Sequence, residues 1–139
     1  RSKDQFLDLA ENPDAFVYSI NHEDENIGYC VIWELQGFYF LEHFEVFEEF
    51  RNQKFGEKIL ESLQEKFEKL ILETEPDSLS EIAERRLRFY ERNGFSVTET
   101  NYLQPSYGEG KYAVNLFLMA NFQPENLETL VQEIYSTVY

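Results

Sequence analysis

Hydrophobic and polar positions alternate in the first third of the chain and then change to a helical spacing. Residues 16–20, 27–35 and 38–46 are predicted strands, and the polar residues 22–26 form the turn between the first two. From Lys54 onward, apolar residues recur every three or four positions with glutamate and lysine between them, which is typical of an amphipathic helix. The pattern predicts an antiparallel meander of three strands followed by a helix.

Further strands are predicted in the second half. The short apolar run 70–72 is bounded by charged residues, which is typical of a buried strand. Segments 95–102 and 112–119 read as a closing pair of strands, with the segment 107–110 as the loop between them.

Three more helices are predicted from the residues at their ends. Ser2 and Gln5 have the spacing of a capping box, and so do Ser78 and Glu81. Pro124 is suited to the first position of a helix. These helices are predicted to span 2–10, 78–94 and 124–138.

The composition limits the class of protein. A chain of 139 residues, 42% of them hydrophobic, can bury one core, so we expect one domain over residues 1–139. We find neither an apolar run of about 20 residues, as a membrane helix needs, nor a signal peptide, and therefore expect a cytoplasmic protein without a membrane partner. The formal net charge of −15 argues against nucleic acid as a partner. One cysteine and two histidines argue against a metal site.

The basic residues are unevenly distributed. Seven of the twelve lie in two short stretches. These are Arg51, Lys54 and Lys58, and then Arg85, Arg86, Arg88 and Arg92. Two such stretches are either solvated faces of two helices or a local anion site on an acidic protein, and both interpretations stay open.

The first basic stretch coincides with the predicted start of a helix. Residues 51–56, with the sequence Arg-Asn-Gln-Lys-Phe-Gly, connect the third predicted strand to this helix. A helix N-terminus offers unpaired N–H groups and a partial positive charge, which suit a phosphate. Gly56 allows a ligand to approach the backbone, and Arg51 and Lys54 add positive charge. Residues 88–95, Arg-Phe-Tyr-Glu-Arg-Asn-Gly-Phe, follow at a helix-to-strand junction.

Together, these two segments resemble the signature of the GNAT family of acetyltransferases, in its small single-domain bacterial members. The family pattern is Arg or Gln, two residues, Gly, one residue, then Gly or Ala. Arg51 and Gly56 match this pattern, whereas Lys54 replaces the first glycine. Residues 89–95 are similar to the family's Phe-Tyr, three residues, Gly-Phe.

The resemblance implies an α/β fold. Its sheet would be mixed and mainly antiparallel, flanked by helices, and splayed between the strand that ends at Val46 and the strand that begins at Leu70. The first strand and first helix of the family are not found in this sequence. Acyl-pantetheine would insert at the splay.

The resemblance also implies acetyl-CoA as the cosubstrate, without a metal. A backbone N–H of Phe44 or Val46 would polarise the thioester carbonyl, and Tyr90 would protonate the departing thiolate. An unperturbed tyrosine with a pKa of about 10 is protonated at neutral pH and suits that role. The implied cofactor-binding residues are Phe44, Val46, Arg51, Asn52, Gln53, Lys54, Phe55, Gly56, Glu57, Lys58, Phe89 and Tyr90.

A candidate base comes from the third predicted strand. Alternation places Glu42 on one face with Phe38, Phe40, Phe44 and Val46. A carboxylate among aromatic residues has a raised pKa and is a candidate general base, directly or through a water. Alternatively, Glu42 is solvated or pairs with an arginine. His43 is expected on the opposite face and becomes the competing base if a bulge rotates the strand.

Other residues are candidates for binding the acceptor. Glu73 and Glu75 follow the buried strand and would attract a cationic amine, although they are equally interpreted as solvated acids. Tyr102, Gln104 and Tyr107 resemble a substrate-side loop of some bacterial family members, but aromatic loops also serve as lids or packing.

The expected function is transfer of an acetyl group from acetyl-CoA to a primary amine of a small molecule, by direct transfer in a ternary complex. The alternative is a non-catalytic acyl-CoA-binding or protein-interaction module on the same fold. A purely structural acidic domain is a third interpretation. The apolar face of the last predicted helix packs on its own core or on a second copy in a homodimer.

Overall fold

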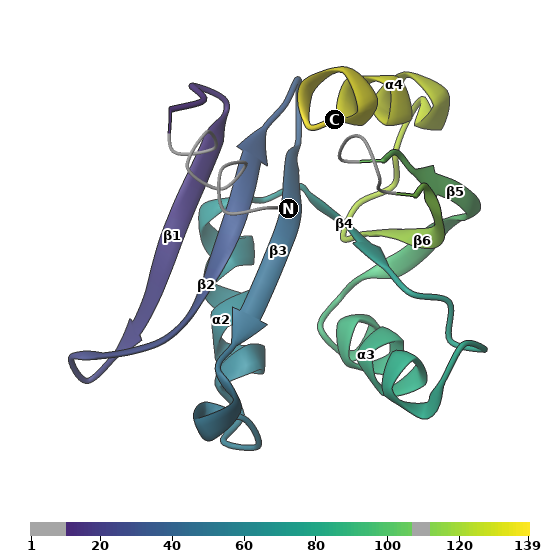
Figure 1. The fold of residues 1–139 in the computed structure, drawn as a ribbon. Coiled ribbons are helices and arrows are strands. Elements are labelled where there is room, and N and C mark those ends of the chain that lie inside the picture. The colour runs from purple at the N-terminus through teal and green to yellow at the C-terminus, as the bar shows by residue number, and fades with distance from the viewer. Residues whose placement is uncertain (1–10, 107–111) are drawn as a thin grey trace.

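The computed structural model describes residues 11–106 and 112–139, which form a six-stranded sheet with helices on both faces (Figure 1). The helix predicted over residues 2–10 lies outside the described residues. The elements are β1 (Ala15–His22), β2 (Glu25–Glu34), β3 (Tyr39–Val46), the 3₁₀ turn η1 (Glu48–Phe50), α2 (Phe55–Lys66), β4 (Leu70–Thr74), α3 (Glu81–Arg92), β5 (Ser96–Gln104), β6 (Val114–Ala120) and α4 (Leu127–Thr137).

The sheet is mixed and mainly antiparallel, as predicted. Its strand order is β1-β2-β3-β4-β6-β5. β1, β2 and β3 form the predicted meander, and β4 runs parallel to β3. β6 lies between β4 and β5 and is antiparallel to both. One parallel pair therefore joins two antiparallel parts.

The turn between β1 and β2 is shorter than predicted. β1 continues to His22 and β2 begins at Glu25. Only Glu23 and Asp24 turn the chain, with φ angles of 49° and 66°. Two positive φ angles are those of a type I′ turn, whose twist suits a tight hairpin. The outer polar residues therefore pair in the ladder instead of forming the turn.

Two helices begin later than their sequence signals suggest. The Ser80 hydroxyl accepts a hydrogen bond from the Ala83 N–H (3.0 Å), so Ser80 and not Ser78 caps α3. The Asn126 side chain accepts one from the Thr129 N–H (3.0 Å), so the cap of α4 comes after Pro124.

Each face of the sheet carries its own apolar cluster. On one face, Leu130 and Ile134 of α4 pack with Trp33 and Phe40. On the other face, α2 and α3 bury residues such as Leu60 against Leu70 and Leu72 of β4. The apolar face of α4 is thus buried on its own sheet, which is the first of the two alternatives given for the last helix.

β3 and β4 separate soon after they meet. Their ladder has three pairs, from Tyr39 with Leu70 to Leu41 with Leu72. Beyond these pairs the strands diverge, as Figure 1 shows. We call this opening the fork; it is the predicted splay of the sheet. No helix among the described residues is long and apolar enough to span a membrane.

Candidate functional site

A β-bulge shapes the β3 side of the fork. Ile32 of β2 pairs with Leu41, but its neighbour Val31 pairs with His43, so Glu42 is an additional residue in β3. The bulge reverses the alternation beyond it. Phe44 therefore packs in the cluster on the α2 and α3 face, whereas Phe40 packs on the α4 face. The expectation that Phe38, Phe40, Glu42, Phe44 and Val46 share one face is wrong for Phe44 and Val46, which lie beyond the bulge.

The bulge also brings Glu42 and His43 to the same face, contrary to the expectation that His43 points away from Glu42. His43 pairs with Val31, which belongs to the cluster on the α4 face. Its Nε2 lies 3.4 Å from the Glu42 Oε2. The alternative in which a bulge makes His43 a competitor of Glu42 therefore has a structural basis.

The same bulge directs backbone N–H groups into the fork. The Tyr39 N–H donates to the Lys69 carbonyl on the β4 side, whereas the Phe47 N–H donates to the Ile27 carbonyl on the β2 side. In an unbroken strand, N–H groups an even number of residues apart point to the same side. Since the bulge shifts this alternation, the N–H groups of Phe44 and Val46 face the edge where β3 has lost β4.

The N-terminus of α2 follows this edge. Lys54 is its N-cap, with a left-handed backbone (φ 63°, ψ 18°) and no side-chain cap. The family pattern has glycine at this position, and glycine adopts such a conformation without strain. Lys54 thus keeps the backbone path of the glycine, and in the described part of the chain no side-chain cap hydrogen bond is made at the start of α2.

Gly56 is needed for helix packing. A Cβ at this position would lie 3.1 Å from the Phe89 Cζ. The missing side chain therefore lets α3 approach the first turn of α2 closely. The sequence suggested close approach of a ligand to this backbone, and it carries no sign of the contact with Phe89.

Three arginines of the basic stretches are paired with acids. Arg51 contacts Glu45 (3.6 Å), and its Nε donates to the Val46 carbonyl (2.8 Å). Arg86 contacts Glu75 (3.2 Å). Arg88 contacts Asp77 (3.3 Å) and Glu91 (2.6 Å).

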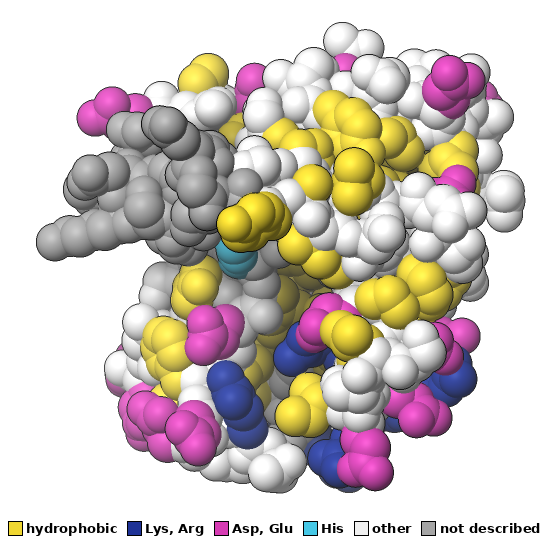
Figure 2. Space-filling model, turned by 45° about the vertical axis from the view of Figure 1, so that its right-hand side comes forward, with side chains coloured by type: hydrophobic (Ala, Val, Ile, Leu, Met, Phe, Trp, Pro, Cys, Tyr) yellow, Lys and Arg dark blue, Asp and Glu magenta, His cyan; other side chains and the backbone are white. Residues whose placement is uncertain are grey.

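Other cations have no such partner. Among the described residues, Lys54, Lys58 and Arg85 form no ion pair. Arg85 lies one turn before Phe89 on the same face of α3, and Phe89 contacts Gly56. Arg85 therefore lies on the face of α3 that approaches the first turn of α2. Figure 2 shows basic side chains interleaved with acidic ones around the lower part of the hollow on this side of the molecule.

Tyr90 lies on the α2 and α3 face of the sheet. Its ring packs against Phe89 and Phe95, with centroids 5.6 and 6.0 Å away. Burial raises the pKa of Tyr90, and the nearby Arg86 opposes this shift. The hydroxyl is therefore protonated at neutral pH.

Glu42 is held on the opposite, α4 face. Its side chain is 1% exposed, and its Oε1 accepts a hydrogen bond from the Trp33 Nε1–H (2.8 Å). With His43 next to Oε2, both oxygens of this carboxylate have a polar neighbour. Glu42 is thus buried, as expected, and contacts Trp33 and His43.

Glu73 is the next residue of β4 after the last pair with β3. Its Oε1 accepts hydrogen bonds from the Tyr139 hydroxyl (2.7 Å) and the Gln104 Nε2 (2.9 Å). Burial raises the pKa of Glu73, three hydrogen-bonding groups including Tyr102 lower it, and the charge of Glu42 raises it further. The two carboxylates therefore interact at the apex of the fork.

The remaining acceptor-side residues differ in their positions. Tyr102 is buried on the α4 face near Glu73. Glu75 is partly exposed and paired with Arg86, as its interpretation as a solvated acid suggested. Tyr107 lies outside the described residues. Gln104, expected on a substrate-side loop, is the last residue of β5 and donates to Glu73. Trp33 and Tyr139 were not predicted as site residues, because only the folded sheet brings them to the carboxylates.

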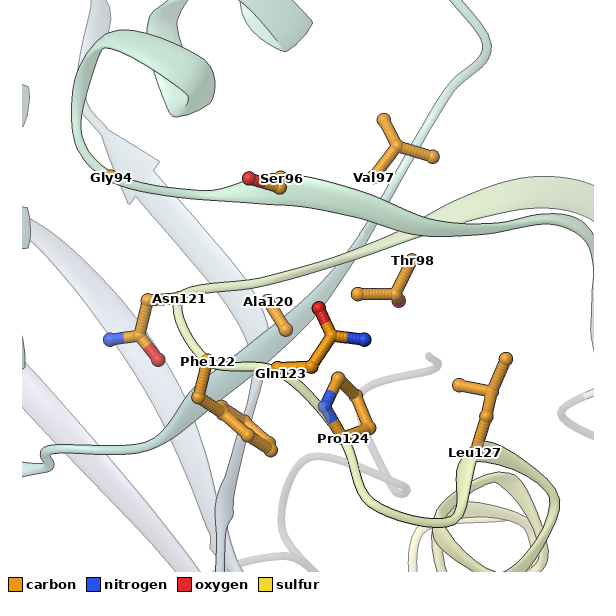
Figure 3. A pocket seen from close by; sticks show the side chains of 10 residues that line it. All are labelled: Gly94, Ser96, Val97, Thr98, Ala120, Asn121, Phe122, Gln123, Pro124 and Leu127. Atoms are coloured by element: carbon orange, nitrogen blue, oxygen red, sulfur yellow. The ribbon is translucent and has the colours of Figure 1, made fainter.

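A separate pocket of about 420 Å³ contains none of the predicted site residues. It lies between the start of β5 and the connection from β6 to α4, and Figure 3 shows Gln123 and Thr98 facing this space. The Asn121 side chain in this pocket is used for packing of the fold, since it accepts a hydrogen bond from the Leu70 N–H and donates one to the Glu68 carbonyl. Among the described residues, no group of three or more potential ligands is arranged to hold a metal ion.

The chain is similar to known proteins in sequence. A family model described as "Acetyltransferase (GNAT) domain" matches residues 13–97. The Bacillus subtilis (strain 168) protein named "Putative acetyltransferase YjbC" is 35% identical over 83 residues, which are 58% of this chain and 43% of that protein. The chain thus spans less than half the length of this curated relative.

Solved structures share the fold of this chain. A "Putative acetyltransferase from GNAT family" of Bacteroides thetaiotaomicron has a TM-score of 0.93 at 29% identity, covering 100% of this chain and 81% of that one. A Bacillus subtilis acetyltransferase in complex with CoA has a TM-score of 0.64 at 17% identity, covering 88% and 85%. With the family model matching more than half of the residues, the chain belongs to the GNAT acetyltransferase family.

Proposed function

We propose that this domain transfers an acetyl group from acetyl-CoA to a primary amine of a small molecule, with both substrates bound at the fork. The arrangement of groups around the fork carries the proposal. Two carboxylates, Glu42 and Glu73, lie on the α4 face, and Tyr90 lies on the other face. A proton can therefore leave the amine on one side of the sheet while another is donated on the opposite side.

The residues present fit acetyl-CoA. Open N–H groups of Phe44 and Val46 suit the amides and thioester carbonyl of the pantetheine arm. The uncapped N-terminus of α2 suits the pyrophosphate, with Lys54 and Arg85 adding charge beside it. When bound, acetyl-CoA supplies a thioester whose acyl carbon the amine attacks.

The chain's own residues would then move two protons. The amine loses one proton to the carboxylate pair of Glu42 and Glu73 as its nitrogen bonds to the acyl carbon. The carbon–sulfur bond breaks, and the Tyr90 hydroxyl donates its proton to the departing sulfur. Solvent returns a proton to Tyr90 and takes one from the carboxylates. The negative charge of the pair favours a cationic acceptor. As part of this proposal we place the enzyme in the cytoplasm, since its one cysteine is buried and free.

Calorimetry with acetyl-CoA and thiol detection with a panel of amines test this function. The panel contains a polyamine, an aminoglycoside, an amino acid and a peptide with a free N-terminus. We expect binding and acetylation of at least one small-molecule amine. Binding without transfer would favour the non-catalytic acyl-CoA-binding module, and absence of binding would refute the assigned site.

Tyr90→Phe tests the acid. It should lower kcat at least tenfold while leaving acetyl-CoA affinity unchanged, because the ring keeps its packing and only the donated proton is lost. Tyr135→Phe is a matched control, since the Tyr135 hydroxyl donates to the Leu103 carbonyl away from Tyr90 (2.7 Å). An unchanged kcat in Tyr90→Phe would remove the residue from this role.

Arg85→Ala tests the phosphate end. It should weaken CoA binding several-fold, whereas Arg88→Ala should not, because Arg88 is already neutralised by Asp77 and Glu91. A substitution at Gly56 is a poorer test, since any side chain there also displaces Phe89. Equal affinities of the two arginine variants would place the phosphates elsewhere.

A further inference from the structure

The two carboxylates at the fork differ in what their oxygen atoms contact. Both oxygens of Glu42 have a polar neighbour, Trp33 on Oε1 and His43 on Oε2. In Glu73, Oε1 accepts the hydrogen bonds of Tyr139 and Gln104, and Tyr102 lies near the carboxylate as a third hydrogen-bonding group. The Glu73 Oε2 is buried and has no hydrogen-bond partner in the described parts of the chain.

We infer that Glu73 Oε2 is the atom that accepts the proton of the acceptor amine, with the Glu42 carboxylate as its neighbour. This assignment rests on the proposed function and specifies which of the two carboxylates is the base. A base needs a lone pair that is directed at the reacting group and not already used. Of these two carboxylates, Glu73 is the one whose oxygen lacks a hydrogen-bond partner.

The location of Glu73 supports this role. The last β3–β4 pair is Leu41 with Leu72, so Glu42 and Glu73 are the next residues on the two diverging strands. The Phe44 and Val46 N–H groups face the same opening from β3. An amine that attacks a carbonyl held by these N–H groups would have Glu73 beside it at the apex of the fork.

Tyr139 and Gln104 act as positioning residues for Glu73. Both donate to its Oε1, and Gln104 Nε2 also donates to the Tyr139 hydroxyl (3.1 Å). This network fixes the carboxylate plane and leaves Oε2 for the substrate. Since these bonds favour the ionised form, they oppose burial, which raises the pKa of Glu73.

The charged and titratable groups around Glu73 come from every neighbouring element. Glu42 faces it from β3, with His43 adjacent to Glu42. Tyr102 lies on β5, and Tyr135 lies on α4 together with the hydrogen-bonded Tyr139 beyond its end. Of these, Glu42 is the charge that raises the pKa of Glu73.

The chemistry balances with these groups alone. As the amine nitrogen bonds to the acyl carbon, its N–H bond breaks and the proton moves to Glu73 Oε2. The carbon–sulfur bond breaks with its electron pair on sulfur, which takes the Tyr90 proton. Solvent then removes the proton from Glu73 and returns one to Tyr90.

The pH dependence of kcat/KM distinguishes the two carboxylates. The assay follows thiol release from acetyl-CoA with the best amine of the panel, for wild type, Glu73→Gln and Glu42→Gln. In Glu73→Gln we expect a loss of at least hundredfold at neutral pH and no acidic limb, with acetyl-CoA affinity unchanged. In Glu42→Gln we expect the acidic limb to remain and to move to lower pH, because the neighbouring negative charge is gone.

Tyr139→Phe adds a readout that a purely structural role would not give. It should move the acidic limb to higher pH, since one hydrogen bond to the ionised carboxylate is lost, whereas Tyr135→Phe should leave the limb in place. Titration of the Glu73 carboxyl by ¹³C NMR, assigned with Glu73→Gln, should show the same shift without any turnover.

The opposite pattern would overturn the inference. If Glu42→Gln abolishes the acidic limb while Glu73→Gln retains it and only raises KM, Glu42 is the base and Glu73 a binding residue. If the wild type binds acetyl-CoA but acetylates no amine, the proposed function itself fails. The two failures are therefore distinguishable.

Discussion

Thr74 offers a sharp test of the packing around the fork. It is the last residue of β4, it is 4% exposed, and its hydroxyl is buried without a hydrogen-bond partner among the described residues. Alternation places its side chain with Leu70 and Leu72 on the α2 and α3 face. A polar group without a partner in such surroundings is destabilising.

Thr74→Val replaces this hydroxyl by a methyl group of nearly the same shape. A buried polar group without a partner costs about 1–3 kcal/mol, and the added apolar surface contributes in the same direction. We expect the free energy of unfolding to rise by about 1–2 kcal/mol. For a chain of 139 residues, this corresponds to a rise in Tm of roughly 3–10 °C.

Urea denaturation and thermal melts of wild type, Thr74→Val and Thr98→Val provide the measurement. Thr98 is the matched control, because its hydroxyl donates to the Leu118 carbonyl (3.3 Å). Thr98→Val should lose about 1 kcal/mol. If both valine variants are destabilised, the Thr74 hydroxyl has a partner and the reasoning from its burial is wrong.

Three further predictions follow from the same structure. Burial raises the pKa of Glu73, so between the unfolded and the folded pKa the native state binds more protons than the unfolded state. The stability of the protein therefore falls as pH rises through the folded pKa of this group. Urea melts from pH 4 to 8 should show Glu73→Gln gaining stability relative to wild type as pH rises. Lys54→Gly should raise the free energy of unfolding by about 0.5–1 kcal/mol, since glycine adopts the left-handed backbone without strain. Asn52→Gly should raise it less, since asparagine tolerates its φ of 66°. Equal increases for the two variants in chemical denaturation would contradict this reasoning. Burial raises the pKa of Cys30 to about 11, so alkylation of the native protein at pH 8 should be at least hundredfold slower than in urea, and rapid native labelling would show that β2 opens.

Much of the fold could be predicted from the spacing of apolar residues. The strands and the amphipathic helices were found because one buried face leaves a period of two or of 3.6. The exact ends of the helices were harder to predict. Ser78 and Ser80 are both suitable caps in sequence, and only the geometry of the Ala83 N–H selects Ser80.

Part of the candidate site could be recognised from the sequence, for reasons that lie in single residues. Motif spacing placed Tyr90 and the N-terminus of α2, because both belong to continuous segments. The bulge at Glu42 has no local signal, so the alternation was extended through it and His43 was assigned to the wrong face. Tyr139 reaches Glu73 from 66 positions away along the chain, and no sequence spacing reports such a contact.

One extra residue in β3 accounts for much of the site. It shifts the strand by one position, so that N–H groups on the far side of the bulge face the fork and Glu42 remains with Glu73 on the α4 face. Strands that separate after three pairs leave backbone donors without strand partners, which is unfavourable unless another group accepts their hydrogen bonds. The carbonyls of an acyl-pantetheine arm would supply such acceptors. If the proposed ligand binds at the fork, its binding and the stability of the sheet are coupled, and a ligand present at a hundred times its Kd would stabilise the native state by about 2.7 kcal/mol.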